Sequence, residues 1–370
     1  MKHLIFGAIL LIALIIFPTC TNEFEGEARI IFESDRTGYK DIFSVLPNGS
    51  ELTNLTETLN AREFEASWSP NGNNIAYVSD PMRSRNDTFG WDMQLIVMKS
   101  DGTNKQVVDK DAPIKRVQWA PSSNEILYFR GAPKQDLHII RKEENGDWGA
   151  PQLLCPSNIY FTNIRTRFFF YGEDHIMFDG LNPLSIFRLN LKTCGIEEFE
   201  ADHDNIQYEP AVTITGRIAF VRNQGGEQSL FIKDSFDVGT VKRLNGTEPF
   251  PHFPSWSLGG DMISFWSNSS SRGPGPIKTI EVSSGKIRTM ESTIPVRARE
   301  DGSYSQRWEP RGRRMVFSGM GPGESDYVND EIYVLHVAFD TIVNVSNNAN
   351  SVDVNPRWQP KRPSQDIPIN

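Results

Sequence analysis

The sequence lacks the short motifs that mark most metal-dependent and nucleophilic enzymes. It contains no His-Glu-x-x-His pair, no Cys-x-x-Cys pair and no Asp-rich calcium loop, although such spacings let one segment supply several metal ligands. It also has no Gly-x-Ser-x-Gly turn of the kind that presents the nucleophile of α/β-hydrolases. We therefore predict no catalytic residue, no bound metal and no cofactor.

Basic clusters and helical segments are equally scarce. The formal net charge is −9 and no block of Lys or Arg stands out, which argues against nucleic-acid binding, because that function needs a clustered basic surface. No segment of useful length has the apolar spacing of a helix, whereas 28 Gly and 23 Pro accompany many short strand-forming runs. This composition predicts an all-β protein with many turns.

An apolar run lies close to the N-terminus. It spans Leu4–Phe17, which is shorter than the ~20 residues of a membrane-spanning helix and matches the apolar region of a signal peptide. Cys20 follows and resembles the lipid-attachment Cys of bacterial lipoproteins, although Thr19 stands where a smaller residue is usual. An ordinary cleaved signal with an incidental Cys is the alternative. We expect a signal peptide over residues 1–20 with Cys20 as the lipidation site, a tether over residues 21–27, and export to the periplasm or outer membrane of a bacterium.

The stretch Ala66–Val108 sets the pattern for the rest of the chain. It contains four short runs with strand propensity, which we name strands A to D: Ala66–Ser69, Ile75–Ser79, Gln94–Met98 and Lys105–Val108. Pro70–Asn73 and Ser100–Thr103 are turn sequences, because Gly and Asn tolerate positive φ and Pro presets φ.

The same unit recurs every ~40–50 residues. Strand B begins at seven positions: Ile30, Ile75, Ile126, Ile176, Ile218, Ile263 and Met315. Strand A is marked by a Trp in five units and has lost it in the fourth and fifth: Trp68, Trp119, Trp256, Trp308 and Trp358. A four-strand unit with this period is typical of a β-propeller blade.

The two ends of the repeat array predict how the propeller closes. Residues 28–56 supply strands B, C and D without a strand A, and Val352–Pro360 supply a strand A with no further strands after it. Since an open ring would expose two sheet edges, we predict that the two segments complete one blade. The prediction is an all-β, seven-bladed β-propeller of four-stranded blades over residues 28–360, followed by a C-terminal tail over residues 361–370.

Three segments resemble the TolB-type propeller repeat: Ser34–Phe43 (SDRTGYKDIF), Trp68–Ser79 (WSPNGNNIAYVS) and Met98–Thr103 (MKSDGT). The resemblance covers residues 28–360 and is weakest over 155–215. It implies the propeller fold and says little about function. Periplasmic TolB proteins carry an α/β domain before a six-bladed propeller, whereas this chain has no room for that domain and shows seven B strands. We therefore expect a relative in fold and not the Tol-system component itself.

Aromatic residues and histidines each have an ordinary structural interpretation. The strand-A tryptophans hold a fixed place in the repeat, so we expect them in the core between blades. Trp91, Trp148 and Trp266 lie outside that place and are freer to bind a ligand. Oligogalacturonate lyases gather a metal from histidines on separate blades, but we expect isolated histidines here, at His138, His175, His203, His252 and His336.

Two cysteines fall within the propeller. Cys155 lies at the end of strand D of the third blade, and Cys194 lies in the C–D turn of the fourth. In an up-and-down blade these points lie on opposite faces, ~15 Å apart for a strand of four or five residues. A disulfide needs Cα atoms within ~7 Å, so we expect two free thiols despite export to an oxidising compartment.

The loops that join B to C, and D to the next A, leave the ring on one face, which we call the B–C/D–A face. It receives three long insertions, Asp80–Gly90, Asn268–Pro276 and Gly319–Asn329, and functional residues concentrate on such loops. Aromatic and Arg side chains are the usual anchors of interfaces. Ten of them in or beside these loops are the predicted partner-binding residues: Arg62, Phe64, Phe89, Trp91, Arg116, Tyr160, Tyr208, His252, Arg299 and Tyr304. Solvated loop residues without a partner are the alternative.

The sequence therefore favours an exported, membrane-anchored binding module for a protein, peptide or glycan partner, without nucleic acid. The alternative is a metal-assisted polysaccharide lyase or hydrolase with its site in the propeller channel. A tightly held divalent ion at one per chain would favour the enzyme.

Overall fold

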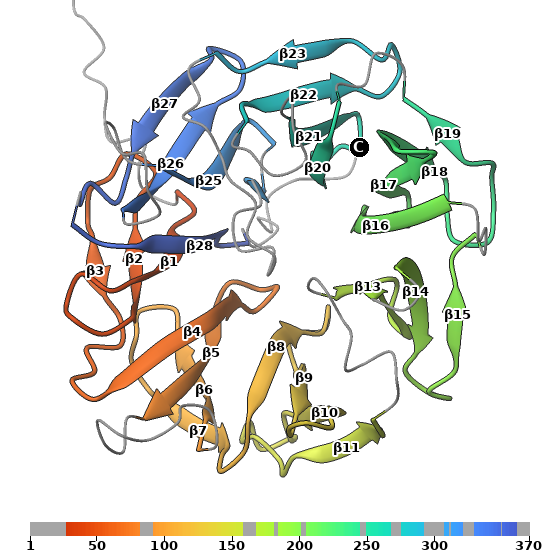
Figure 1. Cartoon of the computed structure of the whole chain (residues 1–370). Coiled ribbons are helices and arrows are strands. Elements are labelled where there is room, and N and C mark those ends of the chain that lie inside the picture. The colour runs from red at the N-terminus through yellow and green to blue at the C-terminus, as the bar shows by residue number, and fades with distance from the viewer. Residues whose placement is uncertain are drawn as a thin grey trace, which may run out of the picture.

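The protein folds as a ring of seven β-sheets. The computed structural model describes residues 27–81, 92–157, 168–180, 184–200, 205–244, 249–267, 275–291, 307–310, 312–320, 329–348 and 350–360. In these residues, 28 strands form seven four-stranded antiparallel sheets, which surround a central axis as the blades of a propeller (Figure 1). The predicted all-β, seven-bladed fold is confirmed. Over the same residues, no helix has the length and apolar character needed to cross a membrane.

Each blade runs from an inner strand A to an outer strand D. The A strands of blades one to seven are β28 (Asp353–Trp358), β4 (Ala61–Trp68), β8 (Ile114–Trp119), β12 (Phe169–Phe170), β16 (Asn205–Val212), β20 (Pro251–Trp256) and β24 (Arg307–Trp308). The B strands are β1 (Ile30–Ser34), β5 (Asn74–Pro81), β9 (Glu125–Arg130), β13 (His175–Gly180), β17 (Ile218–Gln224), β21 (Met262–Ser267) and β25 (Arg314–Met320). The C strands are β2 (Asp41–Val45), β6 (Gln94–Lys99), β10 (Asp136–Arg141), β14 (Ser185–Asn190), β18 (Glu227–Lys233), β22 (Ile277–Glu281) and β26 (Asp330–His336). The D strands are β3 (Thr53–Asn54), β7 (Gln106–Asp109), β11 (Gln152–Cys155), β15 (Ile196–Glu198), β19 (Lys242–Arg243), β23 (Ile287–Thr289) and β27 (Thr341–Asn344).

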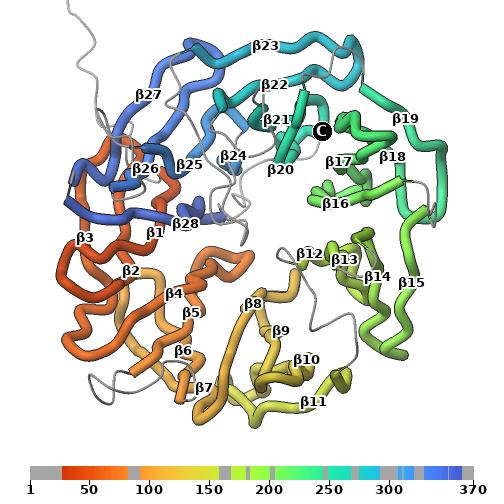
Figure 2. Tube along the Cα trace, viewed as in Figure 1, coloured from red at the N-terminus to blue at the C-terminus, as the bar shows by residue number. Residues whose placement is uncertain are grey.

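The first blade is built from both ends of the propeller. Its sheet has the order β28-β1-β2-β3, with Ile30 opposite Trp358 and Ser34 opposite Asp353. Figure 2 shows the red β1 beside the blue β28. The predicted closure is confirmed, and it leaves no open sheet edge between the first and last blades.

The core lies between neighbouring blades because both faces of each sheet are covered. Along β5, Ala76 and Val78 pack in the cluster shared with blade three, whereas Ile75 and Tyr77 pack in the cluster shared with blade one. Alternate side chains of a strand point to opposite faces, so a strand buried on both sides needs apolar residues at every position. This requirement explains the unbroken apolar runs by which the B strands were predicted.

The five strand-A tryptophans lie in these interfaces, as predicted. Each indole Nε1 donates a hydrogen bond to a strand-A carbonyl of the preceding blade: Trp68 to Arg357 (3.3 Å), Trp119 to Ser67 (3.0 Å), Trp256 to Ala211 (3.1 Å), Trp308 to Ser255 (3.0 Å) and Trp358 to Arg307 (3.0 Å). The large ring thus supplies buried area and also satisfies its own polar group.

The prediction of free thiols is wrong, because Cys155 and Cys194 form a disulfide with their Cα atoms 5.6 Å apart. The error was to treat all strands of a blade as parallel to the axis. Successive strands of a sheet rotate by about 20–25°, so strand D turns toward the circumference of the ring, as β11 and β15 do in Figure 1. The end of strand D in one blade therefore meets the C–D turn of the next.

The same contact occurs elsewhere in the ring without cysteine. Gly102 occupies the position of Cys194 in the C–D turn of blade two, and both residues have positive φ, +85° and +57°. A Cβ on Gly102 would lie 3.0 Å from the carbonyl oxygen of Leu55, the buried residue at the end of strand D in blade one that corresponds to Cys155. The disulfide therefore replaces a packing contact between blades.

Candidate binding face and channel mouth

A β-bulge interrupts strand A in five blades. In each bulge one residue adopts a left-handed conformation with φ between +47° and +59°: Glu65, Arg116, Glu209, Phe253 and Asn355. A bulge disturbs the alternation of side chains, which explains why strand A of blade two was predicted from Ala66 although β4 begins at Ala61. The recurrence of the bulge at one place in the repeat makes it part of the blade design.

Carboxylates of neighbouring blades bind the backbone N–H groups that these bulges leave without a strand partner. Glu33 Oε1 accepts a hydrogen bond from the Glu65 amide at 2.8 Å, and Glu65 Oε2 accepts one from the Val117 amide at 2.9 Å. These bonds connect blades one, two and three in series. Glu33 and Glu65 therefore stabilise the inner strands of neighbouring blades.

A second series of the same kind connects blades four, five and six. Asp179 Oδ2 accepts a hydrogen bond from the Glu209 amide at 3.1 Å, and Glu209 Oε2 accepts one from the Phe253 amide at 2.7 Å. Asp179 and Glu209 are both buried. Charged acceptors roughly double the strength of such bonds, so both series hold the inner strands in register.

Glu63 is the most perturbed acid of this region. Its carboxylate is buried and accepts hydrogen bonds from Thr58 Oγ1 at 2.6 Å and Ser79 Oγ at 3.0 Å. Burial raises the pKa of Glu63 to about 7; the two hydroxyls oppose this rise and the negative charge of Asp41 adds to it. Burial also works to raise the pKa of Asp41, but hydrogen bonds from Thr37 and neighbouring groups hold it below its usual value.

Three of the predicted partner-binding residues lie near the bulges of blades two and three. Arg62 Nε and Nη2 lie 3.0 and 2.8 Å from Asp80 Oδ2, and its guanidinium lies 5.7 Å from the centre of the Phe64 ring. Phe64 packs against the core between blades two and three. Arg116 is the half-exposed, left-handed residue of the bulge in β8. All three side chains are half-buried.

Two further predicted residues are buried. Tyr208 lies in the core between blades five and six. His252 stacks on Trp266 with ring centres 4.5 Å apart, and its Nδ1 lies 3.4 Å from Glu209 Oε1. His252 Nε2 and Trp266 Nε1 are buried without a hydrogen-bond partner. Spacing alone could not separate these core positions from surface loops.

The other predicted residues lie outside the described residues, so they remain predictions: Cys20, Phe89, Trp91, Tyr160, Arg299 and Tyr304. Among the residues that the structure describes, no group of three or more His, Cys, Asp or Glu side chains is placed to hold a metal ion.

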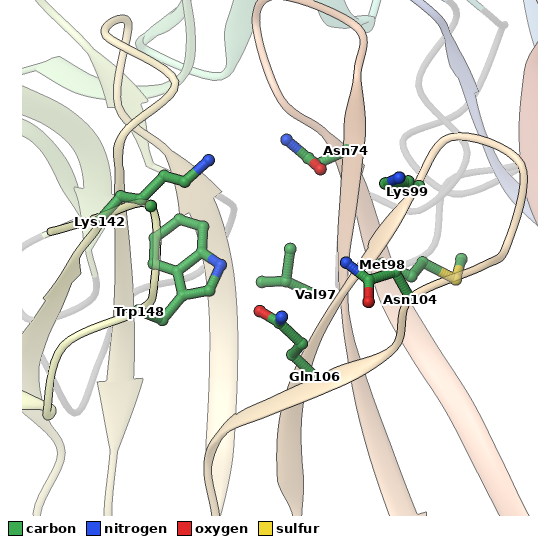
Figure 3. A pocket seen from close by; sticks show the side chains of 9 residues that line it. Asn74, Val97, Met98, Lys99, Asn104, Gln106, Lys142 and Trp148 are labelled. Carbon is green, nitrogen blue, oxygen red and sulfur yellow. The ribbon is translucent and has the colours of Figure 1, made fainter. Parts of the chain in front are cut away.

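One small pocket on the opposite side of the ring was not predicted, although its Trp148 was among the tryptophans expected to be freer to bind a ligand. It lies between blades two and three, where Trp148 and Lys142 face Asn74 and Gln106 (Figure 3). The available signal was the C–D hairpin of blade three, which is longer than its counterparts and carries a Trp outside the repeat position.

Comparisons with known proteins address the fold. No protein-family model and no curated protein matches this sequence. Among solved structures, TolB from Acinetobacter baumannii superposes with a TM-score of 0.51 at 14% identity, over 90% of this chain and 67% of that chain. The predicted resemblance to TolB-type propellers is confirmed at the level of the fold.

Two enzymes have similar folds. Oligogalacturonate lyase from Vibrio parahaemolyticus superposes with a TM-score of 0.60 at 10% identity, over 84% of this chain and 86% of that chain. Puromycin hydrolase gives a TM-score of 0.55 at 14% identity over 79% of this chain, and the match spans about half (49%) of the hydrolase. At these identities the similarity concerns the fold alone, because one propeller fold serves many functions.

Proposed function

We propose that this protein is an exported, membrane-anchored β-propeller that binds a protein, peptide or glycan partner on its B–C/D–A face. The observation that carries the proposal is that four carboxylates near the inner strands are used to bind the backbone. Glu33, Glu65, Asp179 and Glu209 each accept a backbone N–H of a bulge. Acids held in this way rigidify the scaffold that carries the loops, and rigid scaffolds with variable loops are typical of binding proteins.

Arg62 and Arg116 support the choice of face. The Arg62 side chain is 39% exposed, and Asp80 and Phe64 fix its position. A positioned guanidinium loses little conformational entropy when it binds an acidic or carbonyl-rich partner. Asp80, the first residue of the predicted B–C insertion of blade two, pairs with Arg62 across β4 and β5.

The disulfide supports export. Disulfides persist in oxidising compartments and are rare in the cytosol of mesophiles. In the Cys155–Cys194 disulfide, Cys155 is buried in the core between blades three and four and Cys194 is partly buried against it. Export fits the predicted signal peptide, and we propose that Cys20 carries the lipid. The substitution Cys20→Ala should move the protein from the membrane fraction to the soluble fraction. A mature N-terminus elsewhere would refute the anchor.

Capture of partners from native membranes tests the binding face. We expect the paired substitutions Phe89→Ala/Trp91→Ala and Arg299→Ala/Tyr304→Ala, and the single substitution Arg116→Asn, to reduce capture severalfold without lowering the melting temperature. Asn is the replacement for Arg116 because it tolerates positive φ. Phe339→Ala is the matched control, since Phe339 is 79% exposed in a C–D turn. Loss of capture in the control alone would place the partner on the other face.

His252 supports a second candidate function, the metal-assisted lyase or hydrolase. Its buried Nε2 has no hydrogen-bond partner, and its Nδ1 faces Glu209. If this function is correct, purified protein will hold one divalent ion per chain, and His252→Gln will lose it. Metal analysis that finds no such ion after purification without chelators counts against the enzyme.

A further inference from the structure

A cavity of about 140 Å³ lies between blades two and three, beside the C–D turns and away from the proposed partner face. Val97 of β6 is buried and lies at the bottom of the cavity, whereas the neighbouring Met98 turns its side chain toward blade one. Trp148 and Lys142 of blade three form one side, and polar side chains of blade two form the other (Figure 3).

The cavity exists because the C–D hairpin of blade three does not seal against blade two. In blade two, Gly102 packs so closely on blade one that an added Cβ would lie 3.0 Å from the Leu55 carbonyl oxygen. Gly146 holds the corresponding left-handed position in blade three, with φ of +89°. A Cβ there would meet only Lys142 of its own hairpin, at 4.0 Å. The space that the turn of blade two closes against blade one is therefore open here.

The Trp148 ring is held in place before any ligand binds. Its backbone pairs with Lys142, and hydrogen bonds from the Glu143 amide to the Asp147 carbonyl and from the Gly149 amide to the Arg141 carbonyl close the hairpin. The ring packs edge-on against the buried Trp119, with centres 5.6 Å apart and an interplanar angle of 64°. Such preorganisation reduces the entropy lost on binding.

The polar groups around the ring are largely uncommitted, although local hydrogen bonds and the charge of Lys99 together lower the pKa of Asp101 in its own turn. Within the described part of the chain, the carboxamides of Asn74, Asn104 and Gln106 form no hydrogen bond, and the ammonium groups of Lys99 and Lys142 form no ion pair. No carboxylate lines the cavity. Carboxamides both donate and accept hydrogen bonds, as the hydroxyl groups of a sugar do. The two lysines add positive charge.

We propose that this pocket binds one acidic sugar ring, a hexuronic acid unit of a glycan. The apolar face of the sugar stacks on Trp148, its hydroxyl groups bind the three carboxamides, and its carboxylate lies between Lys99 and Lys142. The volume is below the about 300 Å³ at which pockets for whole drug-sized ligands begin, so it accepts a single ring of a longer chain. A flat aromatic anion would leave the carboxamides without partners.

Titration calorimetry and saturation-transfer NMR with three probes test this proposal on the full chain. D-Glucuronic acid should bind with a Kd of about 1 mM, D-glucose at least about fivefold more weakly, and acetate not measurably. Raising the salt concentration should weaken the binding of glucuronic acid and leave the binding of glucose unchanged, because salt screens the charge of the exposed lysines.

Variants locate the binding to the pocket. Trp148→Ala should weaken glucuronic acid at least about tenfold, and Lys142→Gln should remove the preference over glucose. Gln106→Ala is a second variant for the case in which Trp148→Ala does not fold. Gln106 is exposed, so its replacement leaves the core intact and should weaken the binding of both sugars. Phe339→Ala, an exposed aromatic in the C–D turn of blade seven, should change nothing. Equal binding of glucose and glucuronic acid, undiminished binding in Trp148→Ala, or no binding by either sugar at about 10 mM would overturn the proposal.

Discussion

Blade four meets its neighbours in a different way from the rest of the ring. The other five blade interfaces share the indole–carbonyl hydrogen bond of a strand-A Trp. Strand register places Phe170 opposite Ile176 and Val212 opposite Ile218, where Trp68 stands opposite Ile75. Blades four and five therefore lack the Trp, and the two interfaces of blade four need other contacts.

The interface between blades three and four uses a covalent bond at the rim. The Cys155–Cys194 disulfide occupies the contact that Leu55 and Gly102 make elsewhere. Inside the rim, Phe129 and Phe168 pack edge to face with ring centres 5.8 Å apart. Here one cross-link and one aromatic pair stand in for the indole contact.

The interface between blades four and five uses an aromatic cluster with an ion pair on top. Phe199 packs against Phe220 and Phe236 with ring centres 5.2 and 5.3 Å apart. Arg188 lies 4.0 Å from the centre of the Phe236 ring, and its Nη1 and Nη2 donate hydrogen bonds to the two carboxylate oxygens of Asp237. The comparison teaches that a blade interface requires buried area and satisfied donors, and that several sets of residues meet this requirement.

Opening the ring should destabilise both the interfaces of blade four and the interfaces that use the indole contact. Deletion of residues 351–370 removes β28 with Trp358 and exposes the edge of β1, and unpaired edges invite aggregation. We expect aggregated protein without a cooperative thermal transition. Deletion of residues 361–370 alone is the control and should keep the melting temperature. A longer deletion with an unchanged transition would show that the ring does not need this closure.

Removal of the disulfide should weaken the blade three–four interface. Cys155→Ala with Cys194→Ala should lower the free energy of unfolding by about 2–4 kcal/mol, measured by chemical denaturation, and reduction of the wild type should do the same. Cys155→Leu with Cys194→Gly rebuilds the contact of Leu55 and Gly102 and should recover part of the loss. Equal losses in both double variants would mean that this interface cannot use the ordinary contact.

The repeat made the fold predictable because its cues are local. Apolar B strands and the Trp of strand A follow from burial on both faces, so the predicted starts of strand B agree with the structure within one residue. The disulfide escaped because strand twist is a property of the sheet and not of a residue. An alignment of the repeats that places Cys194 at the position of Gly102 would have indicated the disulfide, since both residues take positive φ in a turn that contacts the preceding blade.

The site was less predictable for a related reason. Loop position does not tell whether a side chain turns inward, so Tyr208 and His252 were assigned to a surface although they are buried. The pocket at Trp148 arises from the absence of a contact between two blades. Such a gap depends on how far a hairpin extends, which neither composition nor spacing determines.

The indole contact itself can be tested by a matched pair of substitutions. Trp119→Phe leaves a cavity and removes the donor to the Ser67 carbonyl, and should cost about 2–3 kcal/mol of unfolding free energy. Phe170→Leu changes the equivalent position in blade four, which is half-buried and donates no bond, and should cost about 1 kcal/mol. Denaturation curves compare the two. A larger cost at Phe170 would contradict the view that the indole contact is worth more than the contact that replaces it in blade four.

The two regions should also respond to pH in opposite directions. Glu63, in blade two, has its pKa raised from 4.5 to about 7 by burial. The folded state therefore holds this proton more tightly, and the stability gained is complete below pH 4.5 and lost as the pH rises through about 7. The loss should be about 2–3 kcal/mol. In Glu63→Gln the difference in unfolding free energy between pH 4.5 and pH 8 should shrink by that amount; an unchanged pH profile would show that Glu63 ionises normally.

Asp237, in blade five, gives the smallest effect and the opposite sign. Hydrogen bonds from Arg188 hold the pKa of Asp237 below its usual value, so its contribution is present above pH 3.8 and is lost as the pH falls through the lowered pKa. The Asp237 side chain is 63% exposed, and exposed pairs contribute about 0–1 kcal/mol. Asp237→Asn should therefore lower the unfolding free energy by less than about 1 kcal/mol at pH 7, and the wild type and variant should converge at lower pH. A loss of several kcal/mol would mean that this ion pair, and not the Phe199 cluster beneath it, holds blades four and five together.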